Sequence, residues 1–554
     1  MTTLRSRAGF AYIVLLVLAV STYFYGLDSA HIPKNGDEYV YQHITRLTAQ
    51  SGHWLPLVSE LDQMRNTKPP LLFWQGIRSS DHGGAWTLWN LRWPSVVYSL
   101  LTALTAFLLA RRLSGRWQTG AIAALAFLGF FATYRYGRPF LTNPPEVFWL
   151  FLSFFVIAHF GRRATASRVL VPVLLGISIG IGLLYKSYAL LMPVGLGLAW
   201  SYFHLREYRL GAFIRDDVLK LVLLGALSLA VFALWFALDP DPVAIWREFV
   251  VGENVGKLDS KDGNYFAKLF WGSSSAGSLA LGYPQNAGLL ALPLFGLAVT
   301  AWRRRHHMSE GEALLWIWIV TFFVVFCLPS QRSSRYLLAA MPALAVLLAL
   351  NWERIGQWWF TVTVSLAAII LVLIAVLGLA LQKVLGQDLY GVVFWLIVVT
   401  GLAVAVIALV RPAALRAGCL GLAFITLIAF TALTRPLDGP LGQYDDIALR
   451  VVGTRVVGVP YDFNAKYERY RFLLPEADIR GYRTDANLTD TELRRKFPLY
   501  TIQLPLDALP CQGCRVLAQR IDLRTRDVKF DRDALSPRGF IAAMVVREFL
   551  IESP

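Results

Sequence analysis

Ionisable side chains recur beside long apolar stretches of this chain, and most of them are cationic. A charge next to hydrocarbon is costly unless it faces a cavity, a partner or a polar ligand. A convergent cationic site suits a phosphate or pyrophosphate leaving group, whose charge must be held while a neighbouring carboxylate acts on the acceptor. The side chains that could form such a site are Asp37, Glu38, Lys68, Arg92, Arg135, Arg138, Glu146, Lys186, Arg332 and Arg335.

The acidic members are the candidates for catalysis. Asp37 and Glu38 begin a run, residues 37–51, in which apolar and aromatic side chains recur, so we expect the pair at the start of a helix. First-turn carboxylates are also favoured by the helix dipole alone, and that interpretation stays open. Because the pair closely follows the first apolar stretch, we take Asp37 and Glu38 as candidate catalytic residues, with Glu146, beside a later apolar stretch, as the third.

Two lysines are candidates for binding a phosphate. Lys68 precedes a rigid Pro-Pro turn that leads into an apolar run, and Lys186 interrupts an apolar stretch, residues 169–200, that is long enough for two spans. Lys186 is therefore expected at the tip of an outer hairpin. The alternative for both lysines is that they reach out to lipid headgroups or anchor the chain at the interface.

These residues must be positioned by a membrane domain. The chain has 554 residues, of which 56% are hydrophobic and 16% are charged, more apolar surface than one soluble core could bury. The sequence predicts a multi-span α-helical membrane protein of about thirteen helices, the first a retained signal-anchor helix. The expected spans are approximately 10–27, 91–110, 118–134, 143–160, 169–185, 188–203, 218–238, 286–302, 312–328, 336–350, 359–381, 391–410 and 418–434.

The net charge of +16 reports topology rather than nucleic-acid binding. Counted from a cytoplasmic N-terminus, the basic groups in the short loops all lie on one side, as the positive-inside rule requires. We therefore expect the N-terminus in the cytoplasm, the C-terminus outside, and no nucleic-acid partner.

The membrane domain is expected over residues 1–435, with long outer loops at 28–90 and 239–285. From residue 436 to 554 short β-type runs alternate with charged turns, which predicts a small, soluble, extracytoplasmic α/β domain. No motif gives that domain chemistry of its own, so we interpret it as a cap or interaction module. Its Cys511 and Cys514 suit a short-loop disulfide, with a redox or metal role as the alternative.

Five motifs follow one another in a specific order through the first 350 residues, at 35–39 (NGDEY), 67–74 (TKPPLLFW), 91–95 (LRWPS), 183–186 (LLYK) and 334–338 (SRYLL). In this order they resemble the GT-C glycosyltransferases related to protein O-mannosyltransferases. The resemblance is strongest to the bacterial branch that transfers 4-amino-4-deoxy-L-arabinose from undecaprenyl phosphate to lipid A.

The resemblance implies a GT-C fold and an inverting transfer of a pentose or hexose from a polyprenyl-phosphate donor. The acceptor would be lipid A, a glycan or a protein at the outer, periplasmic face of the bacterial inner membrane, among membrane lipids. The transfer would be metal-independent or assisted by a divalent metal ion, so the metal ligands stay open.

The same resemblance suggests a role for each matching residue. Asp37 corresponds to an aspartate that activates or orients the acceptor. Lys68, Arg335 and Tyr336 correspond to residues that would hold the donor phosphate, and the charge pattern adds Lys186 and Arg138 as candidates for binding it. Candidates for acceptor or loop contacts are Tyr39, Arg92, Asn143, Glu253, Asn254 and Lys257.

The chain departs from the family at three positions. Thr67 stands where relatives commonly have glutamate, Asn143 where they commonly have aspartate, and Glu253 where some have histidine. Neither threonine nor a neutral amide can act as a carboxylate base or a strong hard-metal ligand. Glu146, three residues after Asn143, could substitute because it shares a helix face with it.

Two alternatives to an enzyme remain at this point. A transporter would be expected to show inverted repeats and ionisable residues at mid-membrane depth, whereas the charges here lie near one face. A relative that binds a lipid-linked sugar without turning it over is the second alternative, suggested by Thr67 and Asn143.

Overall fold

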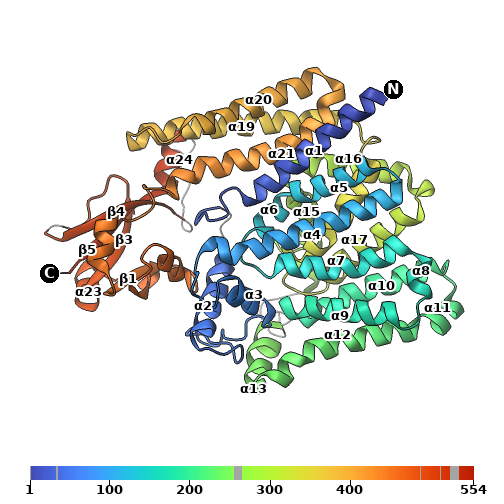
Figure 1. Ribbon diagram of the computed structural model, residues 1–554, viewed down its shortest axis with the longest axis horizontal. Coiled ribbons are helices and arrows are strands. Elements are labelled where there is room, and N and C mark those ends of the chain that lie inside the picture. The colour runs from blue at the N-terminus through green and yellow to red at the C-terminus, as the bar shows by residue number, and fades with distance from the viewer. Residues whose placement is uncertain are drawn as a thin grey trace.

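The computed structural model describes residues 2–32, 35–254, 265–486, 488–511, 513–524 and 536–553. A bundle of long helices makes up most of the molecule, and a small sheet domain formed by the last hundred residues lies at one end of it (Figure 1). The sheet is therefore placed beyond one end of the helices rather than along their sides.

Each of the thirteen predicted spans overlaps an apolar helix or a broken pair of helices. Among the described residues nine helices are long and apolar enough to cross a membrane. The number is ten if the two helices on either side of Phe130, which are bent by 63°, form one span. Thirteen spans therefore stay a prediction. The helices are α1 (Thr2–Phe24), α4 (Leu88–Ser114), α5 (Trp117–Gly129), α6 (Phe131–Gly137), α7 (Asn143–Phe160), α9 (Leu170–Tyr185), α10 (Leu191–Leu205), α12 (Val218–Leu238), α15 (Ala276–Ala287), α16 (Ala291–Arg303), α17 (Glu310–Cys327), α18 (Met341–Asn351), α19 (Gln357–Leu385), α20 (Val392–Val410) and α21 (Pro412–Thr434).

Small residues let neighbouring helices approach closely. At Gly176 and Gly180 of α9, an added Cβ would come within 2.8 Å of Leu227 and 2.6 Å of Val231 on α12. In lipid the hydrophobic effect does not drive helices together, so van der Waals contacts made possible by such close backbone approach stabilise the helix pair.

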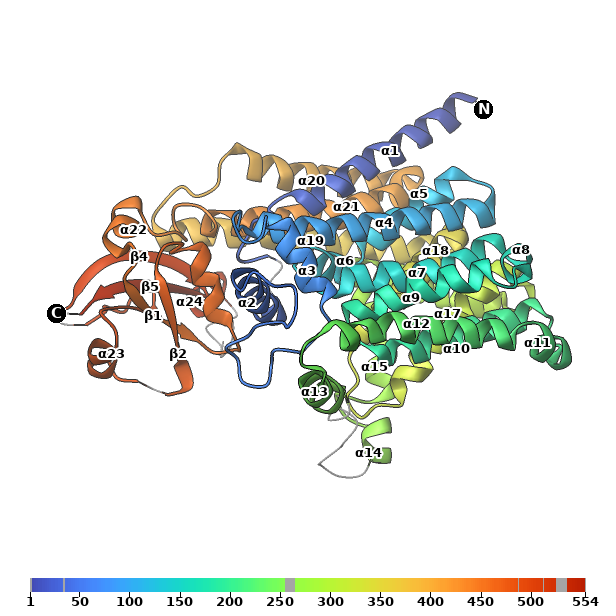
Figure 2. The same ribbon diagram turned by 60° about the horizontal axis from the view of Figure 1, so that its bottom comes forward.

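The outer segments that carry the candidate residues gather at the sheet-domain end of the bundle. They include α2 (Gly36–Gln50), α3 (Leu71–Ser79), α13 (Pro242–Ile245) and the π-helix η2 (Trp246–Asn254). The short helices α8 (Arg162–Ala166) and α11 (Leu210–Asp216) lie at the opposite end in both views (Figure 2). The first outer loop and the start of the second thus share one side, and the basic connections lie on the other.

The C-terminal domain is built on a five-stranded sheet in the order β2-β1-β3-β5-β4. β1 pairs in parallel with β2 and β3, and β5 pairs antiparallel with β3 and β4. Three short helices flank it. The elements are β1 (Val456–Tyr461), β2 (Asp478–Arg483), β3 (Leu499–Pro505), β4 (Arg515–Leu523), β5 (Val545–Glu552), α22 (Asp446–Val452), α23 (Asp490–Lys496) and α24 (Pro537–Met544). A disulfide joins Cys511 and Cys514.

Buried ion pairs fasten this domain to α2. His43 Nδ1 lies 2.7 Å from Glu468 Oε1, and Arg46 donates two hydrogen bonds, of 2.7 and 3.0 Å, to the same carboxylate. Burial alone would raise the pKa of Glu468, but His43 and Arg46 outweigh it and hold the pKa at about 2. The helix that begins with Asp37 is thereby held by the C-terminal domain.

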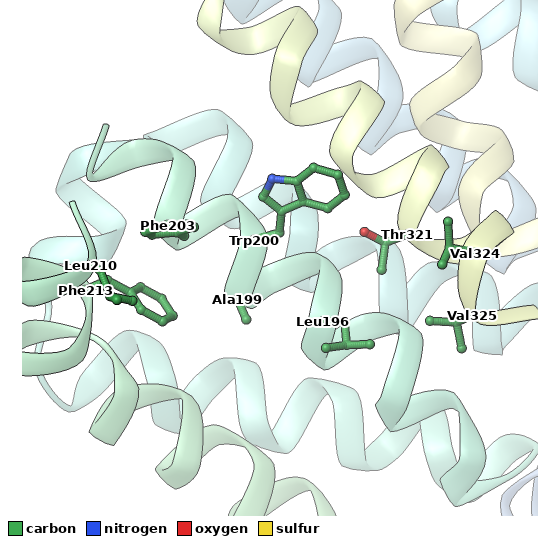
Figure 3. Close-up of a pocket in the computed structure, with 9 residues that line it drawn as sticks. All are labelled: Leu196, Ala199, Trp200, Phe203, Leu210, Phe213, Thr321, Val324 and Val325. Carbon is green, nitrogen blue, oxygen red and sulfur yellow. The ribbon is translucent and has the colours of Figure 1, made fainter. Parts of the chain in front are cut away.

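An apolar groove of about 380 Å³ lies between α10, α11 and α17. Figure 3 shows Trp200 and Phe203 on α10 facing it, with Phe213 on α11 and Val324 and Val325 on α17. None of the residues that line it is ionisable. It offers surface for hydrocarbon and no group for phosphate chemistry.

Candidate functional site

Five of the predicted residues form one continuous polar chain at the sheet-domain end of the helices, which we call the Asp37 network. Arg335 joins two of its members, donating from Nη1 to Asp37 Oδ2 at 2.6 Å and from Nε to Asn143 Oδ1 at 2.8 Å. Asn143 Nδ2 donates to Glu146 Oε2 at 3.2 Å, and Glu146 Oε2 lies 2.8 Å from Lys186 Nζ. The predicted convergence is therefore present for these five side chains.

Local structure fixes Asp37 at the start of α2. Asn35 caps this helix, with its side-chain oxygen accepting a 3.0 Å hydrogen bond from the Asp37 amide. The Asp37 side chain is 39% exposed. Among the described residues only Arg335 bonds to its carboxylate, so one oxygen keeps its accepting capacity for a ligand.

Arg335 is held by the 3₁₀-helix η6 (Ser334–Ala340), which leads into α18. Ser333 caps η6, and the guanidinium carbon of Arg335 lies 5.1 Å from the centre of the Tyr136 ring. A guanidinium over an aromatic face keeps its charge while losing little freedom. The cation is therefore positioned before any ligand arrives.

The hydrogen bonds of Asn143 explain why an amide can stand where relatives commonly have aspartate. Its amide oxygen accepts from Arg335 while its amide nitrogen donates to Glu146. An aspartate could accept from Arg335 but would face the buried Glu146 carboxylate without a proton to offer. The amide thus bridges a cation and an anion in the first turn of α7.

A second contact pair joins the two outer loops. Lys68 Nζ donates to its neighbour's carbonyl oxygen, Thr67 O, at 2.8 Å and to Glu253 Oε1. Asn254 Oδ1 accepts a 2.7 Å hydrogen bond from Ser187, the residue after Lys186. Lys68 and Glu253 are therefore connected to the Asp37 network, because Asn254 follows Glu253 and Ser187 follows Lys186 in the sequence.

Glu38 has surroundings unlike those of Asp37. Glu38 is 2% exposed. Its Oε1 accepts a 2.7 Å hydrogen bond from Arg92 Nε and a 2.8 Å bond from the Phe140 amide, and its Oε2 accepts a 2.7 Å bond from Arg92 Nη2. Arg92 also donates to the carbonyl oxygens of Leu27 and Ser29, at 3.0 and 2.6 Å. These contacts anchor the first outer loop to α4.

Three further candidates make contacts elsewhere. The buried Arg138 donates to the carbonyl oxygens of Tyr23 and Tyr25, at 3.0 and 2.6 Å, while Tyr336 stacks on Phe326 with ring centres 5.1 Å apart. Tyr39 is buried, and burial raises its pKa to about 12, so it stays protonated.

Two basic residues of the first group also lie apart from the network. Arg135 is exposed beside Tyr136, and Arg332 donates to the carbonyl oxygens of Cys327 and Ser274 at 2.8 and 2.7 Å. Lys257 lies outside the described residues.

Among the described residues, each of the three site cations pairs with a carboxylate. Arg335 pairs with Asp37, Lys186 with Glu146 and Lys68 with Glu253. Across the described part of the chain no group of three or more His, Cys, Asp and Glu side chains forms a metal-ligand set. These carboxylates do not make a donor set for a divalent ion, and we derive no step through a metal. An incoming phosphate would instead compete with them for the three cations.

Sequence reasoning missed three contributors. Tyr136 supports Arg335, Ser187 binds Asn254, and Glu248 accepts hydrogen bonds of 2.9 and 3.2 Å from the amide and side chain of Asn66. Each pairs with a residue from another loop, and no motif marks it. Only Tyr136, which stands between the basic residues Arg135 and Arg138, carried any local signal.

Comparisons with known proteins agree with this picture. A family model described as dolichyl-phosphate-mannose-protein mannosyltransferase matches residues 11–248. The undecaprenyl phosphate-alpha-4-amino-4-deoxy-L-arabinose arabinosyl transferase 2 of Proteus mirabilis (strain HI4320) is 28% identical over 355 residues, 62% of this chain and 60% of that protein. The corresponding transferase of Erwinia tasmaniensis is 29% identical over 329 residues, 58% of this chain and 55% of its own length.

Among solved structures, ArnT from Cupriavidus metallidurans bound to undecaprenyl phosphate matches with a TM-score of 0.61 and 17% identity over 97% of both chains. The chain spans about 60% of the length of the first of these curated relatives. Together the matches confirm the predicted resemblance to GT-C glycosyltransferases and show that this chain has their fold.

Proposed function

We propose that this protein is a glycosyltransferase that moves a sugar from a polyprenyl-phosphate donor to an acceptor at the outer face of the bacterial inner membrane. The observation that carries the proposal is the Asp37 network, a half-exposed carboxylate held by an arginine beside a second, lysine-paired carboxylate. The named activity of the relatives, transfer from undecaprenyl phosphate-aminoarabinose, supports the same chemistry.

In the transfer the acceptor oxygen attacks the anomeric carbon of the donor sugar from the face opposite the phosphate. The new bond forms from acceptor oxygen to anomeric carbon while the bond from that carbon to the phosphate oxygen breaks, so the configuration inverts. The electron pair leaves with the polyprenyl phosphate. For a hydroxyl acceptor the proton passes to Asp37; an acceptor that is already a phosphate anion needs only orientation.

The cations stabilise the charge that develops on the departing phosphate. Arg335, Lys186 and Lys68 each stand beside a carboxylate that keeps them in place in the absence of donor. Preorganised cations of this kind contribute to catalysis because they need not be ordered during the reaction. A phosphate that takes over Arg335 would also release Asp37 to accept the proton.

Glu38 and Arg92 have a positioning role in this proposal rather than a catalytic one. The two carboxylate oxygens of the buried Glu38 accept three hydrogen bonds from protein donors. Arg138 is likewise committed to carbonyl oxygens at the end of α1. Both shape the loop on which Asp37 lies.

The acceptor class follows from the relatives rather than from the site. We take lipid A, or a related envelope glycolipid, as the first candidate, and 4-amino-4-deoxy-L-arabinose as the first candidate sugar, because the relatives' names specify that donor. A glycan or protein acceptor stays in view because the matching family model describes protein mannosyltransferases.

Mass spectrometry of envelope glycolipids and glycans from a deletion strain tests the proposal. The strain is compared with itself carrying wild type, Asp37→Asn or, as a matched control, Asp388→Asn at an exposed position of the α19–α20 loop. One sugar that is lost on deletion and restored by wild type and Asp388→Asn, but not by Asp37→Asn, is the expected result. An unchanged glycolipid profile with accumulated lipid-linked sugar would favour a binding or transport protein instead.

A further inference from the structure

A second polar cavity lies where the C-terminal domain meets the membrane domain, away from the residues of the Asp37 network. The cavity is lined by Asp28, Ala30 and His31, together with residues at the start of α4, after α21, in the 3₁₀-helix η8 (Lys466–Phe472) and in β4. Its volume is about 280 Å³. Pockets for small ligands span roughly 300–1,000 Å³, so this cavity lies at the small end and suits a ligand of the size of a sugar unit.

One wall of the cavity is aromatic. The rings of Trp86 and Phe472 both line it and lie parallel, at an interplanar angle of 5° with centres 6.3 Å apart. The faces of such rings are electron-rich and attract the weakly positive C–H groups of a ligand. A sugar ring presents C–H groups on its face and hydroxyls on its edge.

Three buried polar atoms on residues that line the cavity have no hydrogen-bond partner among the described residues. Two are donors, Trp86 Nε1 and Arg469 Nε, and one is an acceptor, Asp438 Oδ2. Buried polar atoms without a partner cost free energy, so a retained set of them points to a ligand. Hydroxyl groups can satisfy both kinds because each donates and accepts.

The charges around the cavity already neutralise one another. Arg469 pairs with Asp522, Arg520 with Glu548 at 2.6 Å and with Asp522 at 3.1 Å, and Asp438 Oδ1 lies 2.7 Å from His31 Nδ1. Arg471, the third arginine that lines the cavity, lies 3.2 Å from Glu468, so each lining arginine already has a carboxylate partner and a phosphate would have to displace one. The cavity therefore suits an uncharged, polyhydroxylated ligand.

We propose that this cavity binds a neutral sugar unit, as a second carbohydrate site distinct from the Asp37 network. A structural link connects the two, because Arg92 bonds both to Glu38, next to Asp37, and to the carbonyl oxygen of Ser29 at the cavity edge. We take the bound sugar to be part of the acceptor, and that step rests on the proposed glycosyl transfer. The binding of a sugar in this cavity does not depend on it.

Saturation-transfer NMR on the full chain in nanodiscs tests the site, with N-acetylglucosamine and its β-linked dimer as neutral probes and inorganic phosphate as the charged one. Both sugars should bind. Trp86→Ala should weaken binding at least about tenfold, as for an aromatic anchor in a pocket. Gln443→Ala, which removes an amide side chain that also lines the cavity, should weaken it about threefold. Trp89→Ala, a tryptophan outside the cavity, and Asp37→Asn should leave the affinity within about twofold of wild type.

Absence of sugar binding, equal binding by folded Trp86→Ala and wild type, or displacement of the sugar by phosphate would each overturn the proposal. If Trp86→Ala does not fold, Gln443→Ala at its exposed position decides the matter. Transfer activity with no sugar binding would remove this site alone. Sugar binding without transfer would instead contradict the proposed function.

Discussion

The Asp37 network and the ionic contacts that fasten the C-terminal domain use the same kinds of side chain but differ in how completely these are bonded. Asp37 receives hydrogen bonds from Arg335 alone among the described side chains, and its carboxylate is partly open. Glu468 is fully buried and is bonded by His43, Arg46 and Arg471. Carboxylates that hold the fold are saturated, whereas a carboxylate available for chemistry keeps accepting capacity and access.

The sharpest contrast is between the consecutive residues Asp37 and Glu38. Substitution of Asp37 should lower turnover, whereas substitution of Glu38 should lower stability. Asp37→Asn should lower turnover to a hydroxyl acceptor about 10²- to 10⁴-fold, the range for a lost general base, with little change in thermal unfolding. Glu38→Gln should instead destabilise the protein by about 3–5 kcal/mol, because it leaves Arg92 buried without its anion. Activity assays and unfolding curves on both variants, measured side by side, check this.

The opposite assignment of roles would follow if Asp37→Asn lowered stability and Glu38→Gln lowered turnover. An Asp37→Asn protein that unfolds early with normal turnover of the surviving fraction would mean that Asp37 is the structural residue. Normal stability of Glu38→Gln would show that the pair with Arg92 does not hold the loop.

Acid should loosen the C-terminal domain before it affects the bundle. The pKa of Glu468 lies at about 2 in the folded state, below its ordinary value, so its stabilising contribution is complete above about pH 4.5 and is lost as the pH falls toward 2. The contribution is of the order of 3 kcal/mol. Hydrogen exchange of residues 436–553 as a function of pH should show protection falling in this window.

Glu468→Gln should remove most of that pH dependence, while Glu492→Gln, at an exposed helix cap in the same domain, should retain it. Equal acid sensitivity of wild type and Glu468→Gln would place the titrating group elsewhere.

Lys68→Ala should weaken binding of the donor itself. The substitution removes one of the three site cations and its contact with Glu253, so the Kd for undecaprenyl phosphate should rise about ten- to a hundredfold. Lys383→Ala, at an exposed position near the end of α19, is the matched control. Unchanged affinity in Lys68→Ala would exclude this lysine from the phosphate site.

The smallest effect is expected at the opposite end of the bundle. Arg162 and Glu207 form a 3.0 Å ion pair, but both side chains are more than half exposed. Exposed pairs contribute little, so Arg162→Gln should leave turnover and unfolding unchanged within error. A clear loss of stability would mean that exposure is a poor guide to which ion pairs matter in this chain.

Much of the architecture could be predicted because it depends on local properties. Uninterrupted apolar stretches predicted the membrane helices, and the acidic pair after the first stretch predicted a helix start, which the structure places at Gly36. β2 escaped prediction because its six residues, 478–483, include three charged side chains and a glycine. The β-type run at residues 541–548 predicts a strand that starts near Ile541, whereas β5 begins at Val545. The reason is that a helix capped by Ser536 begins at Pro537 and runs to Met544.

The candidate site was predicted as a group but not residue by residue. Charges beside apolar stretches pointed to convergence, and Asp37, Glu146, Lys186 and Arg335 do converge. The separation of Asp37 from Glu38 could not be foreseen, since neighbours on a helix point about 100° apart and only the tertiary structure decides which one is buried. Partners from other loops, such as Glu253 for Lys68, are equally invisible in the sequence.

The most direct test of the central claim is a transfer assay with the purified chain in nanodiscs, a labelled polyprenyl-phosphate sugar and an envelope glycolipid extract. The account predicts that labelled sugar appears on an acceptor in step with release of free polyprenyl phosphate, and that Asp37→Asn binds the donor but stops both. Donor bound by wild type with no sugar transferred to any acceptor fraction, and no polyprenyl phosphate released, would contradict it.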